Sequence, residues 1–175
     1  VEAAAQEAPQ GSVVALRAGY LLGLRLNDAG DFDGAANALR PLAEANAAGP
    51  LRPYVLAEYG RALSGAGKAD AAATWQALID DPAATSGQRD AALGALADAA
   101  RDAGDATAEQ GWLIARLGAS DTAATRYRLA LVSRDLGDMA TFTAHLTAIV
   151  VNTPASGYAP RAIDSLREGG KPAGA

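Results

Sequence analysis

Large and small apolar residues recur along the chain at helical spacing, and glycines interrupt them at regular intervals. These glycines are Gly30, Gly67, Gly104 and Gly137, spaced by 37, 37 and 33 residues. Seven residues before each glycine stands a small residue, itself preceded by a large one. The four pairs are Leu22-Gly23, Tyr59-Gly60, Leu96-Ala97 and Leu129-Ala130. This pattern predicts an internal repeat of helix pairs. The large residue would fill a groove between helices, and its small neighbour would let the next helix approach.

Each glycine is expected to separate the two helices of a pair. Glycine adopts the left-handed conformation that ends a helix, and a following aspartate caps the next helix by accepting from its free N–H groups. Asp31, Asp105 and Asp138 stand in that position, whereas the second repeat has Lys68 there. We therefore expect a weaker cap in the second repeat, or one supplied by Asp70.

Glycine and proline residues that interrupt the helical pattern divide the chain into four helix pairs and a terminal helix. The expected helices cover residues 12–29, 31–47, 52–66, 68–80, 88–103, 105–117, 121–136, 138–151 and 158–168. The terminal helix has one apolar and one charged face, which suits a capping helix, although it could instead open a fifth repeat. The organisation predicted is a lead-in at 1–11, repeats at 12–50, 51–87, 88–120 and 121–157, the terminal helix, and a tail or linker at 169–175.

Composition supports an all-α fold and removes several function classes. Alanine, the best helix former, is abundant, and cysteine is absent, which removes disulfides, thiolate catalysis and cysteine-ligated zinc. The net charge of −5 argues against nucleic acid as a partner. No apolar run reaches the length needed to span a bilayer, so no transmembrane segment is expected. The chain begins without Met, which suggests processing or a cut edge.

These features resemble the tetratricopeptide repeat family, whose unit is two antiparallel helices with a large-small pair in the first helix. Ala35 and Ala72 match the family's second-helix alanine, and Pro154 matches its terminal proline; Glu109 and Phe142 depart from the pattern. The resemblance covers about residues 12–168 and implies a right-handed α-α superhelix whose concave face binds a protein or peptide. It implies no cofactor.

A narrower resemblance concerns the segment from "RYRLALVSRDLGDMATFTAHL" to "AIDSL". It looks like the degenerate repeats of bacterial envelope proteins, such as the helical, non-catalytic part of soluble lytic transglycosylases. The catalytic domain of those enzymes has a Glu-Ser motif and a Gly-Leu-Met-Gln run, and neither occurs here. The resemblance thus implies only a superhelical accessory domain, an extracytoplasmic location (periplasm or cell surface) and a partner in peptidoglycan-related machinery.

Individual residues offer little sign of catalysis. His145 is the one histidine, eight residues after its hinge glycine, where Trp75 and Trp112 stand in the second and third repeats. We expect all three to pack in an equivalent slot between helices. Asp80 and Asp81 are expected to form a turn before a proline rather than a metal site. The glycines are spaced as helix hinges and form no phosphate-binding loop.

The best candidates for function are exposed positions of the first helices, which by the family resemblance would line the groove. Tyrosine and arginine anchor many interfaces. The candidate groove residues are Arg17, Tyr20, Tyr54, Arg61, Asp98, Arg101, Tyr127 and Arg134. The sequence favours a non-enzymatic module that binds a protein or peptide segment. The alternatives are the transglycosylase accessory domain and a structural element that self-associates through its end faces.

Overall fold

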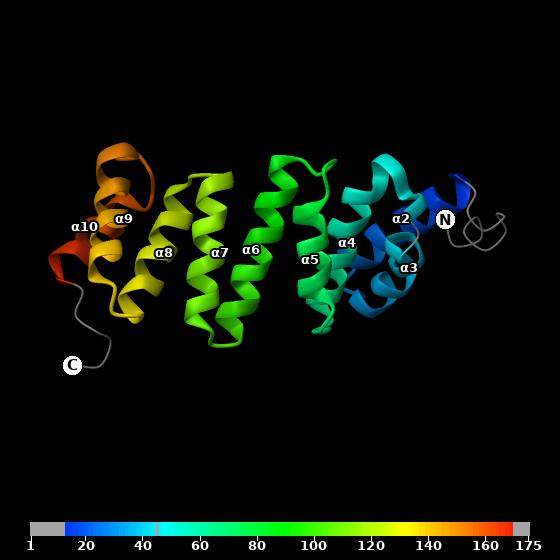
Figure 1. Ribbon diagram of the computed structural model, residues 1–175, viewed down its shortest axis with the longest axis horizontal. Helices are drawn as coiled ribbons and strands as arrows, with labels where there is room; N and C mark the ends of the chain where they lie inside the picture. Colours follow the sequence, from blue (N-terminus) through cyan, green and yellow to red (C-terminus); the bar gives the residue numbers. More distant parts are fainter. Residues whose placement is uncertain (1–12, 45, 170–175) are drawn as a thin grey trace. The chain divides into compact units, whose positions relative to one another are not determined.

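The computed structural model describes residues 13–44 and 46–169, and this part of the chain is built from α-helices without strands (Figure 1). The predicted lead-in 1–11 and the tail from residue 170 onward lie outside the described residues. The chain forms two compact units that divide within helix α6, between Ala92 and Leu93. The all-α prediction is confirmed, and consecutive helices pack against one another as in a helical-repeat solenoid. The handedness of the expected superhelix stays a prediction.

The first unit contains two helix pairs. They are α2 (Val13–Asp28) with α3 (Phe32–Glu44), and α4 (Arg52–Gly65) with α5 (Ala71–Asp80), joined by the short segment η1 (Asn46–Leu51). The two first helices, α2 and α4, also contact each other directly. α6 (Ser86–Asp102) begins in this unit and ends in the next.

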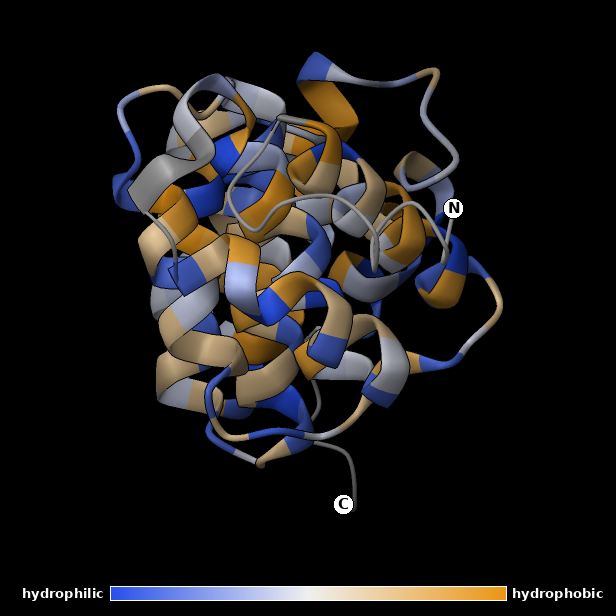
Figure 2. Cartoon of the chain, turned by 90° about the vertical axis from the view of Figure 1, so that its right-hand side faces the viewer, coloured by the Kyte–Doolittle hydropathy of each residue, from blue (hydrophilic) through white to orange (hydrophobic). Residues whose placement is uncertain are grey.

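The second unit continues from α6 into α7 (Ala106–Ala119), α8 (Ala123–Asp135), α9 (Met139–Asn152) and α10 (Ala159–Arg167). α10 packs against α9, and its buried Ala159 and Ala162 join the hydrophobic cluster of Phe142 and Leu146. The terminal helix therefore covers the last pair, as expected of a cap. Hydrophobic and hydrophilic residues alternate along the ribbons in Figure 2, as in amphipathic helices.

The small residue of each large-small pair meets the second helix of the same pair. A Cβ added to Gly23 would lie 2.6 Å from Leu39 Cδ2, and one added to Gly60 would lie 2.8 Å from Trp75 Cε2. Ala97 shares a core cluster with Leu113, and Ala130 shares one with Leu146. These contacts confirm that the small side chains let the helices of each pair approach closely.

The four hinge glycines all have left-handed backbone, with φ between 64° and 81°. Asp31, Asp105 and Asp138 accept hydrogen bonds from backbone N–H groups at the start of α3, α7 and α9, over 2.9 to 3.0 Å. The predicted helix 68–80 begins three residues late, at Ala71, and Asp70 precedes it without a side-chain cap. With lysine at the position after the glycine, the chain lacks the carboxylate that would start the helix there.

Candidate functional site

Four of the predicted groove residues lie in the first unit, on α2 and α4. Arg17 and Arg61 are exposed, Tyr20 is half-buried, and Tyr54 is 49% exposed. Tyr20 and Tyr54 come from neighbouring helices and lie close enough to interact electrostatically, together with Glu58. We call this surface the α2–α4 face. It consists of Tyr20, Asn27 and Asp28 of α2 with Tyr54, Glu58 and Arg61 of α4.

A buried amide holds the polar part of the α2–α4 face in place. Asn27 is 2% exposed, and its Nδ2 donates to the backbone carbonyl of Glu58 over 2.9 Å and to its carboxylate Oε2 over 2.8 Å. Arg61 Nη1 lies 3.2 Å from Asp28 Oδ1 and 3.6 Å from Glu58 Oε2. The carboxylate of Glu58 is therefore shared between a buried amide and an exposed guanidinium, which fixes its position beside the tyrosines.

The hydroxyl of Tyr20 stays protonated at neutral pH. Burial raises the pKa of Tyr20 above its ordinary value of 10.0, and the nearby Glu58 carboxylate raises it further. A protonated phenol can donate a hydrogen bond as well as accept one. The α2–α4 face thus combines two aromatic rings, a phenolic donor, a carboxylate and a guanidinium. Such a set can hold a peptide by contact area and hydrogen bonds.

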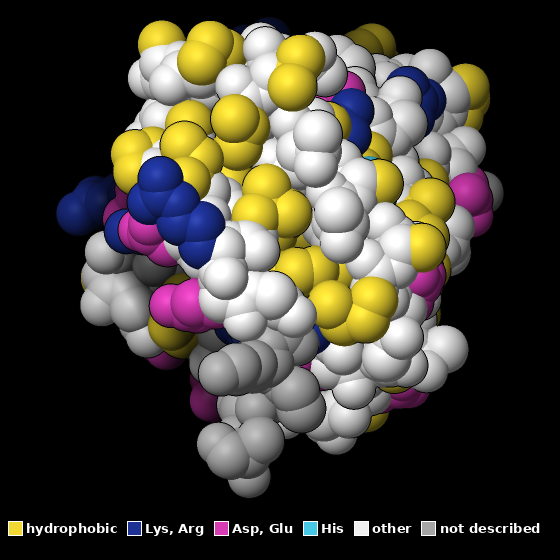
Figure 3. All heavy atoms as spheres, turned by 90° about the vertical axis from the view of Figure 1, so that its left-hand side faces the viewer, with side chains coloured by type: hydrophobic (Ala, Val, Ile, Leu, Met, Phe, Trp, Pro, Cys, Tyr) yellow, Lys and Arg dark blue, Asp and Glu magenta, His cyan; other side chains and the backbone are white. Residues whose placement is uncertain are grey.

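The other four predicted residues lie in the second unit, where several have partners within the fold. Asp98 pairs with Arg128 and lies 3.5 Å from Arg101, while Arg101 and Arg134 each also pair with the aspartate next in sequence. Tyr127 stacks at a tilt on Tyr158, with ring centroids 5.5 Å apart, and its hydroxyl lies 3.4 Å from Ser165 Oγ of α10. At the left edge of the face drawn in Figure 3, basic side chains likewise lie beside acidic ones.

A polar cluster around Arg128 joins three helices of the second unit. Arg128 of α8 donates from Nε to Glu109 Oε1 over 2.6 Å and from Nη2 to the Ala97 carbonyl over 2.8 Å. Glu109 is only 7% exposed. It stands where the repeat pattern expects alanine, and that departure was the one sequence signal of a buried carboxylate that needs a cationic partner. The cluster ties α6, α7 and α8 together.

His145 and the two tryptophans do not share one environment. Trp75 is buried against Gly60, and its Nε1 donates to Ser64 Oγ over 2.9 Å, as expected of a core residue. Trp112 and His145 are only partly buried, because their neighbours Leu113 and Leu146 occupy the core position. The expectation of one equivalent slot is therefore wrong for these two residues. In α5 the core position falls one residue earlier, because Trp75 lies eight residues after its hinge glycine whereas Leu113 and Leu146 lie nine after theirs.

His145 is held by Arg126, whose Nη1 lies 3.2 Å from His145 Nδ1. Burial lowers the pKa of His145 below its ordinary value of 6.5, and Arg126 lowers it further, against the opposing effect of Asp121 and Asp138. The imidazole is therefore neutral at pH 7 and accepts from the guanidinium. Among the described residues, no group of three or more potential metal ligands comes together.

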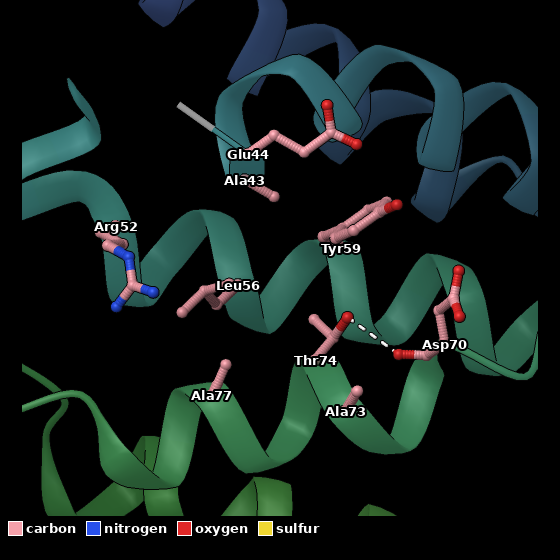
Figure 4. Close-up of a pocket in the computed structure, with 9 residues that line it drawn as sticks. All are labelled: Ala43, Glu44, Arg52, Leu56, Tyr59, Asp70, Ala73, Thr74 and Ala77. Atoms are coloured by element: carbon pink, nitrogen blue, oxygen red, sulfur yellow. Dashed lines mark hydrogen bonds between the residues drawn. The ribbon is translucent and has the colours of Figure 1, made fainter. Parts of the chain in front are cut away.

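A second candidate surface lies in the first unit between α3, α4 and α5. It is an open hollow of about 290 Å³, and α4 forms its floor (Figure 4). We call it the α3–α5 hollow. The residues that matter most for its chemistry are Glu44 of α3, Arg52 and Tyr59 of α4, and Asp70, Ala73 and Ala77 at and along α5. The sequence does not reveal this surface, because it depends on the space that side chains of three consecutive helices leave between them.

Some of the missed residues carry a signal in the sequence, and others do not. Asn27 lies four residues after Gly23, so helical periodicity turns both to the buried side of α2, and a buried amide requires partners. Glu58 and Asp28 carry no such signal, because exposed acids are common on any helix. In the part of the chain that the structure describes, no helix is long and apolar enough to cross a bilayer.

Comparison with protein families and with curated proteins found no match to this chain. The structure itself establishes an all-helical, repeat-like fold with packing between consecutive helices.

Proposed function

We propose that this chain is a non-enzymatic interaction module that binds a peptide or protein segment through the α2–α4 face. The observation that carries the proposal is the pair Tyr20 and Tyr54, which lie together on neighbouring first helices with Tyr54 half exposed. Tyrosine supplies a large contact area at small entropic cost, and it is enriched among residues that dominate binding energy.

The charged groups of the face support a polar rim around these rings. Arg61 is exposed, and its partners Asp28 and Glu58 are acids of the same face. Exposed ion pairs contribute little to stability. A carboxylate of a bound segment could therefore replace Asp28 or Glu58 as the partner of Arg61 at a small cost in free energy. Asn27 would hold Glu58 in place while this happens.

The proposal can be tested by selecting binders from a library of random linear peptides on the immobilised full chain. A selected peptide should bind the Tyr54→Ala/Arg61→Ala variant at least tenfold more weakly than the original protein, as expected when anchor residues are truncated. Ile114→Ala is the matched control, because Ile114 is a similarly exposed large residue on α7. The proposal fails if no peptide is enriched, or if the double variant binds every selected peptide as well as the control does.

The accessory-domain alternative, the extracytoplasmic location and a partner in peptidoglycan-related machinery rest on the sequence resemblance alone. They stay predictions.

A further inference from the structure

The α3–α5 hollow lies on the side of α4 opposite to the α2–α4 face. Arg52, Leu56 and Tyr59 point into the hollow, whereas Tyr54, Glu58 and Arg61 belong to the other surface. At 3.6 residues per turn these two sets fall on opposite sides of the helix. A ligand in the hollow would therefore be separate from a segment bound on the α2–α4 face.

The charges of the hollow do not balance. Its one cation, Arg52, forms an ion pair with the buried carboxylate of Asp81. Among the residues whose side chains the structure describes, 14–44 and 49–169, none forms a hydrogen bond or ion pair with the carboxylates of Glu44 and Asp70. In Figure 4 these carboxylates flank the hydroxyl end of Tyr59. The surface is left with uncompensated negative charge on two sides of an aromatic ring.

Asp70 differs from the other aspartates that precede second helices. The carboxylates of Asp31, Asp105 and Asp138 accept hydrogen bonds from backbone N–H groups. Asp70 makes no such side-chain cap. Its backbone carbonyl bonds within α5, accepting from the backbone N–H of Thr74 over 3.1 Å and from Thr74 Oγ1 over 3.0 Å (Figure 4). Its carboxylate points away from α5, so it is available to a ligand.

The rest of the wall is apolar except for Thr74, whose hydroxyl is already bound to the Asp70 carbonyl. Ala73 and Ala77 face the hollow from α5, and Leu56 faces it from α4. A volume of about 290 Å³ is at the lower end for ligand sites and accommodates one long side chain rather than a larger molecule. Alanine surfaces suit the methylene stem of such a side chain, with its charged end beside Tyr59 and the acids.

We propose that the α3–α5 hollow binds an arginine side chain presented by a partner polypeptide. A guanidinium stacks on an aromatic ring while donating to carboxylates in its own plane, whereas the ammonium of lysine acts as a point charge. Tyr59 supplies the ring, Glu44 and Asp70 supply the acceptors, and the negative net charge of the chain favours the approach of a basic segment.

The test uses the capped tripeptide acetyl-Gly-Arg-Gly-amide, titrated into the full, isotopically labelled chain and followed by backbone amide NMR. The same peptide with citrulline in place of arginine keeps the shape and removes the charge. We expect arginine-dependent shifts at the amides of Tyr59, Ala73 and Ala77, and a Kd at least tenfold weaker for Glu44→Gln/Asp70→Asn. Asp164→Asn/Glu168→Gln changes the net charge equally at the exposed C-terminal helix, and it should bind as the original protein does.

Four outcomes would overturn the proposal. The first two are no shifts in the hollow and equal shifts from the citrulline peptide. The third is equal weakening in both double variants, which would indicate attraction to overall charge. The fourth is a lysine peptide that binds as tightly as the arginine peptide. Tyr54→Ala/Arg61→Ala should leave this titration unchanged, so failure here is distinguishable from failure of the proposed function.

Discussion

Gly23 of α2 packs against the side chain of Leu39 of α3, so closely that a Cβ on Gly23 would fall 2.6 Å from Leu39 Cδ2. Leu39 is fully buried and cannot turn away. Gly23→Ala should therefore lower the free energy of unfolding by about 1–2 kcal/mol, since overpacking costs more than the gain in helix propensity. Urea unfolding measures this difference.

Gly111→Ala is the control for that substitution. Gly111 is exposed within α7, and nothing lies within 4 Å of an added Cβ. Here only helix propensity acts, and we expect a gain of about 1 kcal/mol. If Gly23→Ala stabilised the protein as Gly111→Ala does, this result would contradict the close packing of α2 against α3 at Gly23.

Trp75 and Trp112 should respond differently to truncation. Trp75→Ala removes a buried ring and its hydrogen bond to Ser64, and we expect a loss of about 3–5 kcal/mol in the free energy of unfolding. Trp112→Ala should lose clearly less, because its ring lies at the edge of its cluster. Thermal melting of both variants decides the matter, and an unchanged melting temperature for Trp75→Ala would contradict its place in the core.

Arg128 should matter chiefly because it compensates Glu109. Arg128→Met leaves a buried carboxylate without its partner and should cost about 3–5 kcal/mol of unfolding free energy. Adding Glu109→Met removes the unpaired charge, and most of that loss should return. Chemical denaturation of both single variants and the double variant gives the coupling, and simple additivity would show that the pair is not coupled.

Acidification should weaken the second unit through His145. Its pKa in the folded protein is below 6.5, so as the pH falls below that value the unfolded chain takes up the proton first. Stability present above pH 6.5 is then lost as the pH falls through the folded pKa. Urea midpoints at pH 7.5 and 5.5 should drop more for the original protein than for His145→Gln. An equal drop in both would remove His145 as the cause.

The repeat was predictable because it depends on local rules. Gly30 and Gly104 end helices by backbone conformation, and Asp31 and Asp105 start the next ones, so sequence spacing suffices. The late start of α5 shows the limit of the same rule: Lys68 stands where a cap belongs, and Asp70 does not replace it.

The candidate surfaces were less predictable because they depend on contacts between helices. Tyr20, Tyr54 and Arg61 were identified by register, but the framework of Asn27 and Glu58 requires two helices in contact. Tyr127 was identified by the same register. It contacts the ring of Tyr158 and the hydroxyl of Ser165, because the terminal helix packs there. The α3–α5 hollow depends on side-chain volumes from three helices, which no periodicity encodes.

The most direct test of peptide binding on the α2–α4 face is photo-cross-linking of a selected peptide. The photoreactive residue p-benzoylphenylalanine would replace Leu21, which follows Tyr20 in α2, in one variant and Ile114 in another, both exposed large residues outside the proposed anchors. Efficient cross-linking from position 21 and little from position 114, competed by unlabelled peptide, is the predicted result. Equal yields from both positions, or none from position 21, would contradict binding at this face.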